Sequence, residues 1–213
     1  MQGMIFTLRR KRRCLPDIRF IIRRYGSVMV FSAALALGVL SGSLVSGSID
    51  SKVLNKLDLL FLTNLPQRLS DGAFGAFCAS FGSDFIFLST SFLLGISLFG
   101  VFILPFVAFF KGYGIGLSAG CLLISHGLSG MLFYITVLLP GICLFCLALV
   151  YQLRASLEMY RITARYLFKH CSGSYKKELR IYFRKSVIYL AAALVASVLD
   201  VILWFSLSGI YKF

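Results

Sequence analysis

The chain has 213 residues, of which 59% are hydrophobic and only 14% are charged, and its mean hydropathy is +0.88. Soluble domains are roughly 45–50% apolar and about 25% charged, so this chain has too few polar side chains to cover itself in water. The net charge of +14 comes from 22 Lys and Arg against eight acidic residues, and the basic residues stand in blocks between apolar runs. This pattern excludes a soluble enzyme, a secreted disulfide scaffold and a disordered tail, and it argues against a nucleic-acid-binding protein. It predicts an integral membrane protein.

Five apolar segments are long enough to cross a bilayer, which takes about 20 residues in a helix. The first follows a basic stretch, as a cleavable signal peptide would, but its length favours an uncleaved membrane anchor. The third and fourth meet at a glycine-rich turn and are predicted to form a helical hairpin. The expected fold is all-α, a single membrane domain spanning residues 1–213 with five transmembrane helices. These are predicted at Val28 to Ser48, Phe85 to Phe110, Gly112 to Gly130, Met131 to Leu153 and Ser186 to Leu207.

The distribution of basic residues predicts the topology. Residues 1–27 carry eight Lys and Arg, and residues 154–185 carry nine. The positive-inside rule places both blocks in the cytoplasm, so the chain must cross the membrane an even number of times between them. The glycine-rich third segment is therefore expected to be a full span rather than a re-entrant loop. The N-terminus is predicted to be cytoplasmic and the C-terminus outside, with Lys111 in a cytoplasmic turn between the second and third spans.

Two segments between the spans are amphipathic. The extracytoplasmic loop 49–84 has apolar residues at helical spacing, which indicates short helices that lie on the membrane or cap the bundle. The same apolar residues are candidates for docking an extracytoplasmic partner, and both interpretations stay open. The basic segment 154–185 is expected to lie at the cytoplasmic membrane surface, attracted by anionic lipid headgroups. The candidate docking residues are Leu57, Phe61, Phe74, Phe77 and Phe81.

Small residues recur every four positions in two of the spans. This spacing lets two helix backbones approach closely, because no side chain stands between them. Whether the partner helix belongs to the same chain or to a second copy stays open, and so does a homo-oligomer. Pro105 and Pro140 are expected to kink the second and fourth spans or to mark a cavity. The predicted packing glycines are Gly38, Gly42, Gly112, Gly116 and Gly120.

Asp200 is the only acidic residue predicted inside a span. Charged groups in hydrocarbon are costly and are often functional. A carboxyl that is hydrogen-bonded to a neighbouring helix and a transport or proton-relay role are both open for Asp200. The chain has no zincin, nucleophile-elbow or Walker motif, so we expect no catalytic, cofactor-binding or metal-binding residues and no enzymatic activity.

The segment Leu93–Tyr151 resembles the stage II sporulation protein M family of bacterial membrane proteins. The resemblance implies a non-catalytic membrane anchor of an engulfment complex in the cell membrane at the sporulation septum. Its implied partners are a peptidoglycan lytic transglycosylase and a peptidoglycan amidase. Many family members carry an acidic residue shortly after the proline, which Gly141–Leu147 lacks, and this favours the sporulation branch. The shared landmarks are Leu94-Gly95-Ile96, Phe110-Lys111-Gly112, Gly116, Gly120 and Leu139-Pro140.

A second function is predicted by other features of the same spans. Asp200, the glycine-rich third segment and the two prolines are also typical of a small membrane transporter, a channel or a subunit of an export system. The sequence thus predicts a membrane scaffold in peptidoglycan remodelling, with a transport protein as the alternative.

Overall fold

The computed structural model describes residues 18–48, 72–97, 100–169 and 175–207. Within these residues all regular structure is helical, and five helices are long and apolar enough to cross a membrane. The prediction of five such helices is therefore confirmed. They are α1 (Ile18–Val45, extended by a 3₁₀ turn at Ser46–Ser48), α4 (Gly72–Ile96), α5 (Gly100–Phe133), α6 (Leu139–Lys169) and α7 (Tyr175–Leu207).

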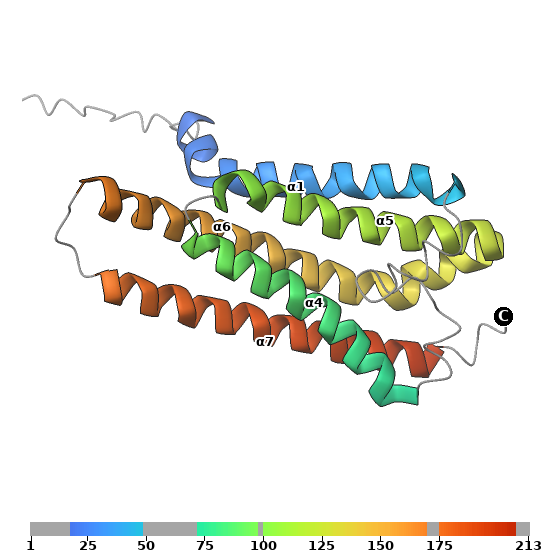
Figure 1. The fold of residues 1–213 in the computed structure, drawn as a ribbon. Helices are drawn as coiled ribbons and strands as arrows, with labels where there is room; N and C mark the ends of the chain where they lie inside the picture. Colours follow the sequence, from blue (N-terminus) through green and yellow to red (C-terminus); the bar gives the residue numbers. More distant parts are fainter. Residues whose placement is uncertain (1–17, 49–71, 98–99, 170–174, 208–213) are drawn as a thin grey trace, which may run out of the picture.

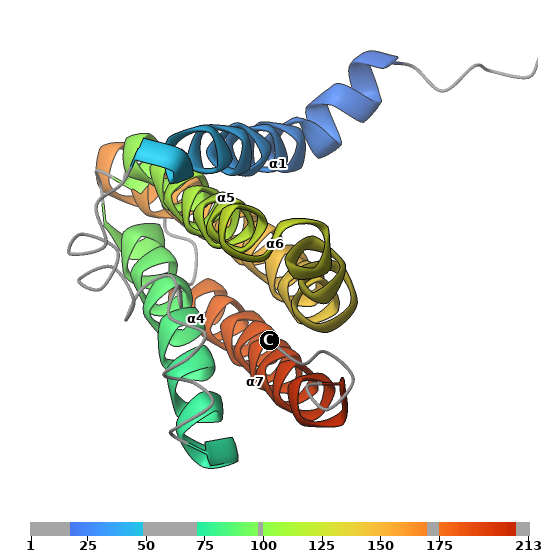
Figure 2. The same ribbon diagram turned by 90° about the vertical axis from the view of Figure 1, so that its right-hand side faces the viewer.

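Helices α1 and α5 lie side by side along most of their length (Figure 1). A Cβ atom on Gly38 would collide with the Phe109 carbonyl oxygen, and one on Gly116 would collide with the Val39 carbonyl oxygen. Residue numbers rise together along the two helices, with Leu35 beside Gly112 and Ser46 beside Gly120, so the helices are parallel. Within the described residues α1 contacts neither α4 nor α7, and it therefore forms one edge of the bundle (Figure 2).

The chain reverses direction within α5 at Gly127, which has φ 59° and ψ −139°. A left-handed φ is easily adopted only by glycine, so this residue makes the reversal inside the predicted turn. Beyond it, the Tyr134 hydroxyl donates a hydrogen bond of 3.2 Å to the Ile115 carbonyl oxygen, which joins the two arms of the hairpin.

A π-helical turn, Tyr134–Leu138, precedes α6. The Leu139 amide bonds to the Tyr134 carbonyl, a span of five residues. Proline has no amide hydrogen, and its ring collides with the carbonyl four residues earlier, so Pro140 accounts for this widened turn. Pro105, by contrast, lies inside α5, where the only non-helical backbone angles are those of Gly127.

The predicted second span, Phe85 to Phe110, is wrong. One helix ends at Ile96 and the next begins at Gly100. Apolar composition continues across this break, and the break therefore had no hydropathy signal; the local signals are Gly95, Ser97 and Gly100. Helix α4 begins at Gly72, so its first half occupies part of the predicted loop 49–84, and residues 49–71 lie outside the described residues.

This shift moves Lys111 from the predicted turn to the interior of α5. It lies about 16 Å along the helix from Gly100, at a rise of about 1.5 Å per residue, which is close to the middle of a hydrocarbon layer about 30 Å thick. Asp84 likewise moves from the loop to the middle of α4. Asp200 is therefore not the only acidic residue inside a helix that could span the membrane.

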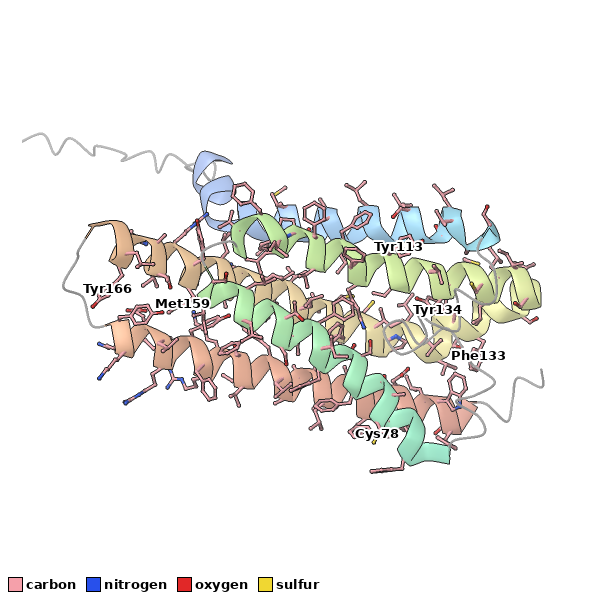
Figure 3. The ribbon with its side chains drawn as sticks, in the orientation of Figure 1. Cys78, Tyr113, Phe133, Tyr134, Met159 and Tyr166 are labelled. Carbon is pink, nitrogen blue, oxygen red and sulfur yellow. The ribbon has the colours of Figure 1, made fainter. Side chains whose placement is uncertain are left out.

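Helix α6 contacts every other helix of the bundle. Its fully buried side chains Phe145, Leu149 and Leu153 pack with Leu104 of α5 and Ala193 of α7 in the largest apolar cluster. Nearer the end of the hairpin, Phe133 stands edge-on to Trp204 with ring centroids 5.3 Å apart (Figure 3). The core thus follows α6 from one end of the bundle to the other.

Helices α6 and α7 are longer than a membrane is thick. They have 31 and 33 residues, or about 46–50 Å at the helical rise, against about 30 Å of hydrocarbon. Their basic portions, the predicted surface segment 154–185, lie together at the left of Figure 1. There Met159 of α6 packs with Tyr182 of α7 (Figure 3). Residues 170–174, which join the two helices, lie outside the described residues.

Candidate functional site

The most unusual feature of the interior is an ion pair between α4 and α5. The Lys111 Nζ atom lies 2.8 Å from Asp84 Oδ1, and each side chain is only 10% exposed. Lys111 also donates a hydrogen bond of 3.3 Å to the Ser83 hydroxyl. An isolated buried charge costs several kcal/mol, and removal of one partner of a pair exposes that cost. The pair therefore makes the positions of α4 and α5 interdependent.

Two aromatic rings surround the ammonium group of Lys111. Its Nζ atom lies 4.6 Å from the ring centroid of Phe145 on α6 and 5.0 Å from that of Phe87 on α4. Ring faces carry negative charge density and attract cations, more strongly where water is excluded. Lys111 is thus held by a carboxylate, a hydroxyl and two rings, which come from α4 and α6.

A second polar contact lies one helical turn away on α4. The Ser80 hydroxyl donates a hydrogen bond of 3.1 Å to Asp200 Oδ2, and both residues are buried. This bond joins α4 to α7. A Cβ atom on Gly141 of α6 would lie 3.2 Å from the Asp200 Cβ atom, tighter than an ordinary contact. The small residue at position 141 therefore lets α6 pack beside the carboxyl group.

These groups line one small cavity of about 60 Å³ between α4, α5, α6 and α7. A water molecule needs roughly 10–15 Å³ by this measure and two to four polar partners, so the cavity has room for a few waters. Two carboxyl groups, one ammonium and several hydroxyls could exchange protons with such waters. The polar residues of its lining are Ser80, Asp84, Lys111, Ser118, Tyr134 and Asp200.

The arrangement offers little to a metal ion. No group of three or more His, Cys, Asp or Glu side chains comes together in the described part of the chain. The carboxylate of Asp84 is already paired with the ammonium of Lys111. What the cluster can do chemically is to bind a proton or a few waters, and to join three helices.

A second polar network joins the far end of α4 to α6 and α7. The Ser156 hydroxyl donates to the Ser91 carbonyl oxygen at 2.8 Å, and the Tyr182 hydroxyl donates to the Phe92 carbonyl oxygen at 2.9 Å. The two hydroxyls lie 2.9 Å apart. A Cβ atom on Gly95 would collide with the Tyr182 hydroxyl, so glycine is needed for this approach.

The same network continues along α6 and α7. The side chains of Gln152 and Ser186 exchange two hydrogen bonds, of 2.9 and 3.0 Å. Gln152 and Ser156 are 1% and 0% exposed, whereas Ser186 is partly exposed, so the network runs from the interior toward the surface of the bundle.

The structure places the predicted site residues in three different settings. Gly38, Gly42, Gly112, Gly116 and Gly120 all lie in the α1–α5 contact, and Asp200 lines the cavity. Of the docking candidates, Leu57 and Phe61 lie outside the described residues. The other three are on α4, where Phe74 is 79% exposed and Phe77 stacks on Phe81 with centroids 5.9 Å apart.

Sequence reasoning missed Asp84, Lys111 and the Tyr182 network. Each of Asp84 and Lys111 was assigned to a segment outside the membrane because the second span was placed about 13 residues too late. The sequence does contain one indication of their position, because apolar stretches lie on both sides of each residue. A helix that includes such stretches would place each charge inside the membrane, where it needs a partner. The Tyr182 network joins residues far apart in sequence and has no local pattern.

Comparisons with known proteins add no family to this geometry: no protein-family model, curated protein or solved structure matches the chain.

Proposed function

We propose that this chain is a non-catalytic membrane scaffold that holds peptidoglycan hydrolases at the membrane during engulfment in an endospore-forming bacterium. In this proposal its N-terminus is cytoplasmic and its C-terminus outside. The process and the partners, a lytic transglycosylase and an amidase, come from the resemblance of Leu93–Tyr151 to the stage II sporulation protein M family. The role as a scaffold, rather than as an enzyme or a carrier, is supported by the interior of the bundle.

The observation that carries the proposal is the pairing of the buried polar groups. Lys111 is held by Asp84, and Asp200 accepts a hydrogen bond from Ser80. The cavity between them measures only about 60 Å³. This volume is too small to form a solute path across about 30 Å of hydrocarbon. An interior of this kind fixes the helices relative to one another, which is what a scaffold requires.

The first half of α4 is the surface best suited to a partner. Phe74, Phe77 and Phe81 form one stripe along it, and its N-terminal end projects past α7, as the position of Cys78 shows (Figure 3). In the proposed topology this end lies at the outer face, where peptidoglycan hydrolases work. Exposed aromatic side chains are common at the centres of protein interfaces.

The test is a pull-down in mild detergent from sporulating cells. The wild-type chain should co-purify the transglycosylase and the amidase. Phe74→Ser should reduce their recovery severalfold, because it removes the most exposed ring of the stripe. Phe102→Ser is the matched control, since Phe102 is 78% exposed on α5 against 79% for Phe74 and lies at the opposite end of the bundle. The proposal would be overturned if the wild-type chain recovered neither enzyme.

The segment before α4 needs a separate variant. Deletion of residues 50–84 would also remove half of α4, including Ser80 and Asp84, and would damage the bundle. Replacement of residues 50–71 by a Gly/Ser linker of equal length leaves α4 complete. If this linker variant inserts normally and still recovers both enzymes, the contribution of the segment to docking is excluded.

Transport is the second candidate, and the shared cavity of Asp84, Lys111 and Asp200 favours it. Ionisable residues inside membranes often mark ion or proton pathways. If the chain carries protons or ions, Asp200→Asn should lower flux into reconstituted vesicles and leave the recovery of partners unchanged. If it is a scaffold, wild-type and Asp200→Asn vesicles should show the same leak as vesicles without protein.

A further inference from the structure

A polar cavity of about 220 Å³ opens on the side of the α6–α7 pair, away from the intramembrane cluster. Residues from both helices line it, and they include two cations, one carboxylate and two phenol rings. The residues are Tyr151, Arg154, Ala155 and Glu158 of α6 and Lys185 and Tyr189 of α7.

The charged groups of this cavity converge on one point. Glu158 Oε1 lies 3.2 Å from Arg154 Nε, and Glu158 Oε2 lies 3.6 Å from Lys185 Nζ. Two cations from different helices thus share one carboxylate, and the cluster keeps a net charge of +1. A monoanion with a hydrogen-bond donor of its own would neutralise the excess charge and satisfy the carboxylate at the same time.

The cavity lies where the two helices leave the apolar layer. From Gly112 to Leu153 the chain has no Lys, Arg, Asp or Glu, and Arg154 is the first. On α7, Lys185 is the last basic residue before an apolar stretch that runs to Leu199. The charged end of the cavity is therefore at the depth of lipid phosphates, because Lys and Arg side chains concentrate at that boundary.

The apolar side of the cavity continues toward the middle of the membrane. Tyr151 lies about one turn before Arg154, and Tyr189 lies about one turn after Lys185 on the antiparallel helix, so both rings are on the hydrocarbon side of the charges. Tyrosine is enriched at this level because its ring is apolar and its hydroxyl is polar. One turn deeper on the same face of α6, Leu147 is 63% exposed, and acyl chains can lie against it.

We propose that this cavity is a binding site for an anionic phospholipid whose headgroup carries hydroxyl groups, of which phosphatidylglycerol is the simplest. Arg154 and Lys185 bind the phosphate, and Glu158 accepts a hydrogen bond from a headgroup hydroxyl. The tyrosines border the glycerol backbone. The proposal concerns lipid recognition and stands whether or not the chain is a scaffold for hydrolases.

Native mass spectrometry of the purified full chain tests this site with equal amounts of competing lipids. Phosphatidylglycerol should be retained at least tenfold more than phosphatidylcholine, which has no net charge and no headgroup donor. The variant R154Q/K185Q should lose most of this preference. The control R161Q/K176Q removes the same charge from the same two helices at exposed positions outside the cavity, and it should keep the preference. Equal losses of the preference in the two double variants would show that it depends only on the overall positive charge, and this result would overturn the proposed site.

The role of Glu158 is tested with phosphatidylmethanol, an anionic lipid without a hydroxyl donor. The wild-type chain should prefer phosphatidylglycerol over it severalfold, and Glu158→Gln should narrow that difference. No difference in the wild-type chain would overturn the assignment of Glu158. The single variant Lys185→Gln repeats the phosphate test if R154Q/K185Q fails to fold. Soluble glycerol phosphate should not displace the lipid, and equal competition by it would overturn a lipid site in favour of a free phosphate.

Discussion

The two sides of the bundle are held together by different means. On the α1–α5 side, glycines such as Gly38 and Gly116 bring carbonyl oxygens of one helix against the Cα atoms of the other. On the other side, polar contacts join α4 to its neighbours: an ion pair to α5, the Ser80–Asp200 hydrogen bond to α7, and the Tyr182 network to α6 and α7. Figure 2 shows α1 at one edge of the bundle and α4 and α7 at the other, with α5 and α6 between them.

The difference reflects how helices associate when the surroundings are already apolar. Without a hydrophobic driving force between helices, association depends on close van der Waals contact and on polar bonds. The α1–α5 contact depends on the absence of side chains, so added atoms should damage it. The polar side depends on complete pairs, so removal of a single partner should damage it.

The largest effect is expected for Lys111→Met. It leaves the Asp84 carboxyl buried without its cation, and breaking a buried pair in this way costs about 3–5 kcal/mol of folding free energy. Thermal unfolding in detergent measures the loss. The double variant D84L/K111M should recover most of the stability, because it removes both charges. A double variant no more stable than the single one would contradict a pairwise contact.

Gly116→Leu should have the next largest effect, on the opposite side of the bundle. A side chain at this position meets the Val39 backbone of α1, and overpacking of this kind costs about 3 kcal/mol at the upper end of its usual range. Gly82→Leu is the matched control, because nothing lies within 4 Å of a Cβ atom at that position. Equal unfolding temperatures for the two variants would show that α1 and α5 do not pack closely.

Tyr182→Phe should have a moderate effect. It removes the hydroxyl that bonds to the Phe92 carbonyl oxygen and lies 2.9 Å from the Ser156 hydroxyl, and it keeps the ring that stacks on Phe92. A lost hydrogen bond of this kind costs about 1 kcal/mol. Tyr166→Phe, at an exposed ring of α6, should leave the unfolding temperature unchanged. A similar shift in both variants would contradict the network.

The smallest effect is expected for Glu158→Gln. The side chains of Glu158 and Lys185 are each 46% exposed and that of Arg154 is 25% exposed, and such surface pairs contribute about 0.3–0.5 kcal/mol. The difference from wild type should vanish at high salt, since exposed charges are screened. A loss as large as that of Lys111→Met would mean that the exposed ion pair stabilises the fold as much as the buried one, which would contradict the expected difference.

The two sides also differ in how far the sequence predicts them. The α1–α5 glycines follow a local spacing of four residues, so their shared face can be read from the chain, although the sequence does not reveal that the two helices meet each other. The hairpin at Gly127 was likewise predicted from its glycines. Both patterns involve residues that are close together in the sequence, so they can be recognised without knowledge of how the helices are arranged.

The polar side could not be predicted in the same way. Asp84 and Lys111 are 27 residues apart and Ser80 and Asp200 are 120 apart, so their pairing depends on the arrangement of three helices. One error in helix boundaries, the span placed at Phe85 to Phe110, removed both members of the ion pair from the predicted membrane interior. Hydropathy could not correct it, because the residues on either side of the break are equally apolar.

In the proposed function, the buried charges of Asp84 and Lys111 stabilise a scaffold and carry nothing across the membrane. The most direct test is the recovery of peptidoglycan hydrolases by D84L/K111M from sporulating cells, together with its flux in vesicles. We expect wild-type recovery of both enzymes and no change in flux, because two apolar side chains replace a structural pair. A folded D84L/K111M protein that recovers both enzymes but has lost a flux present in the wild type would contradict it.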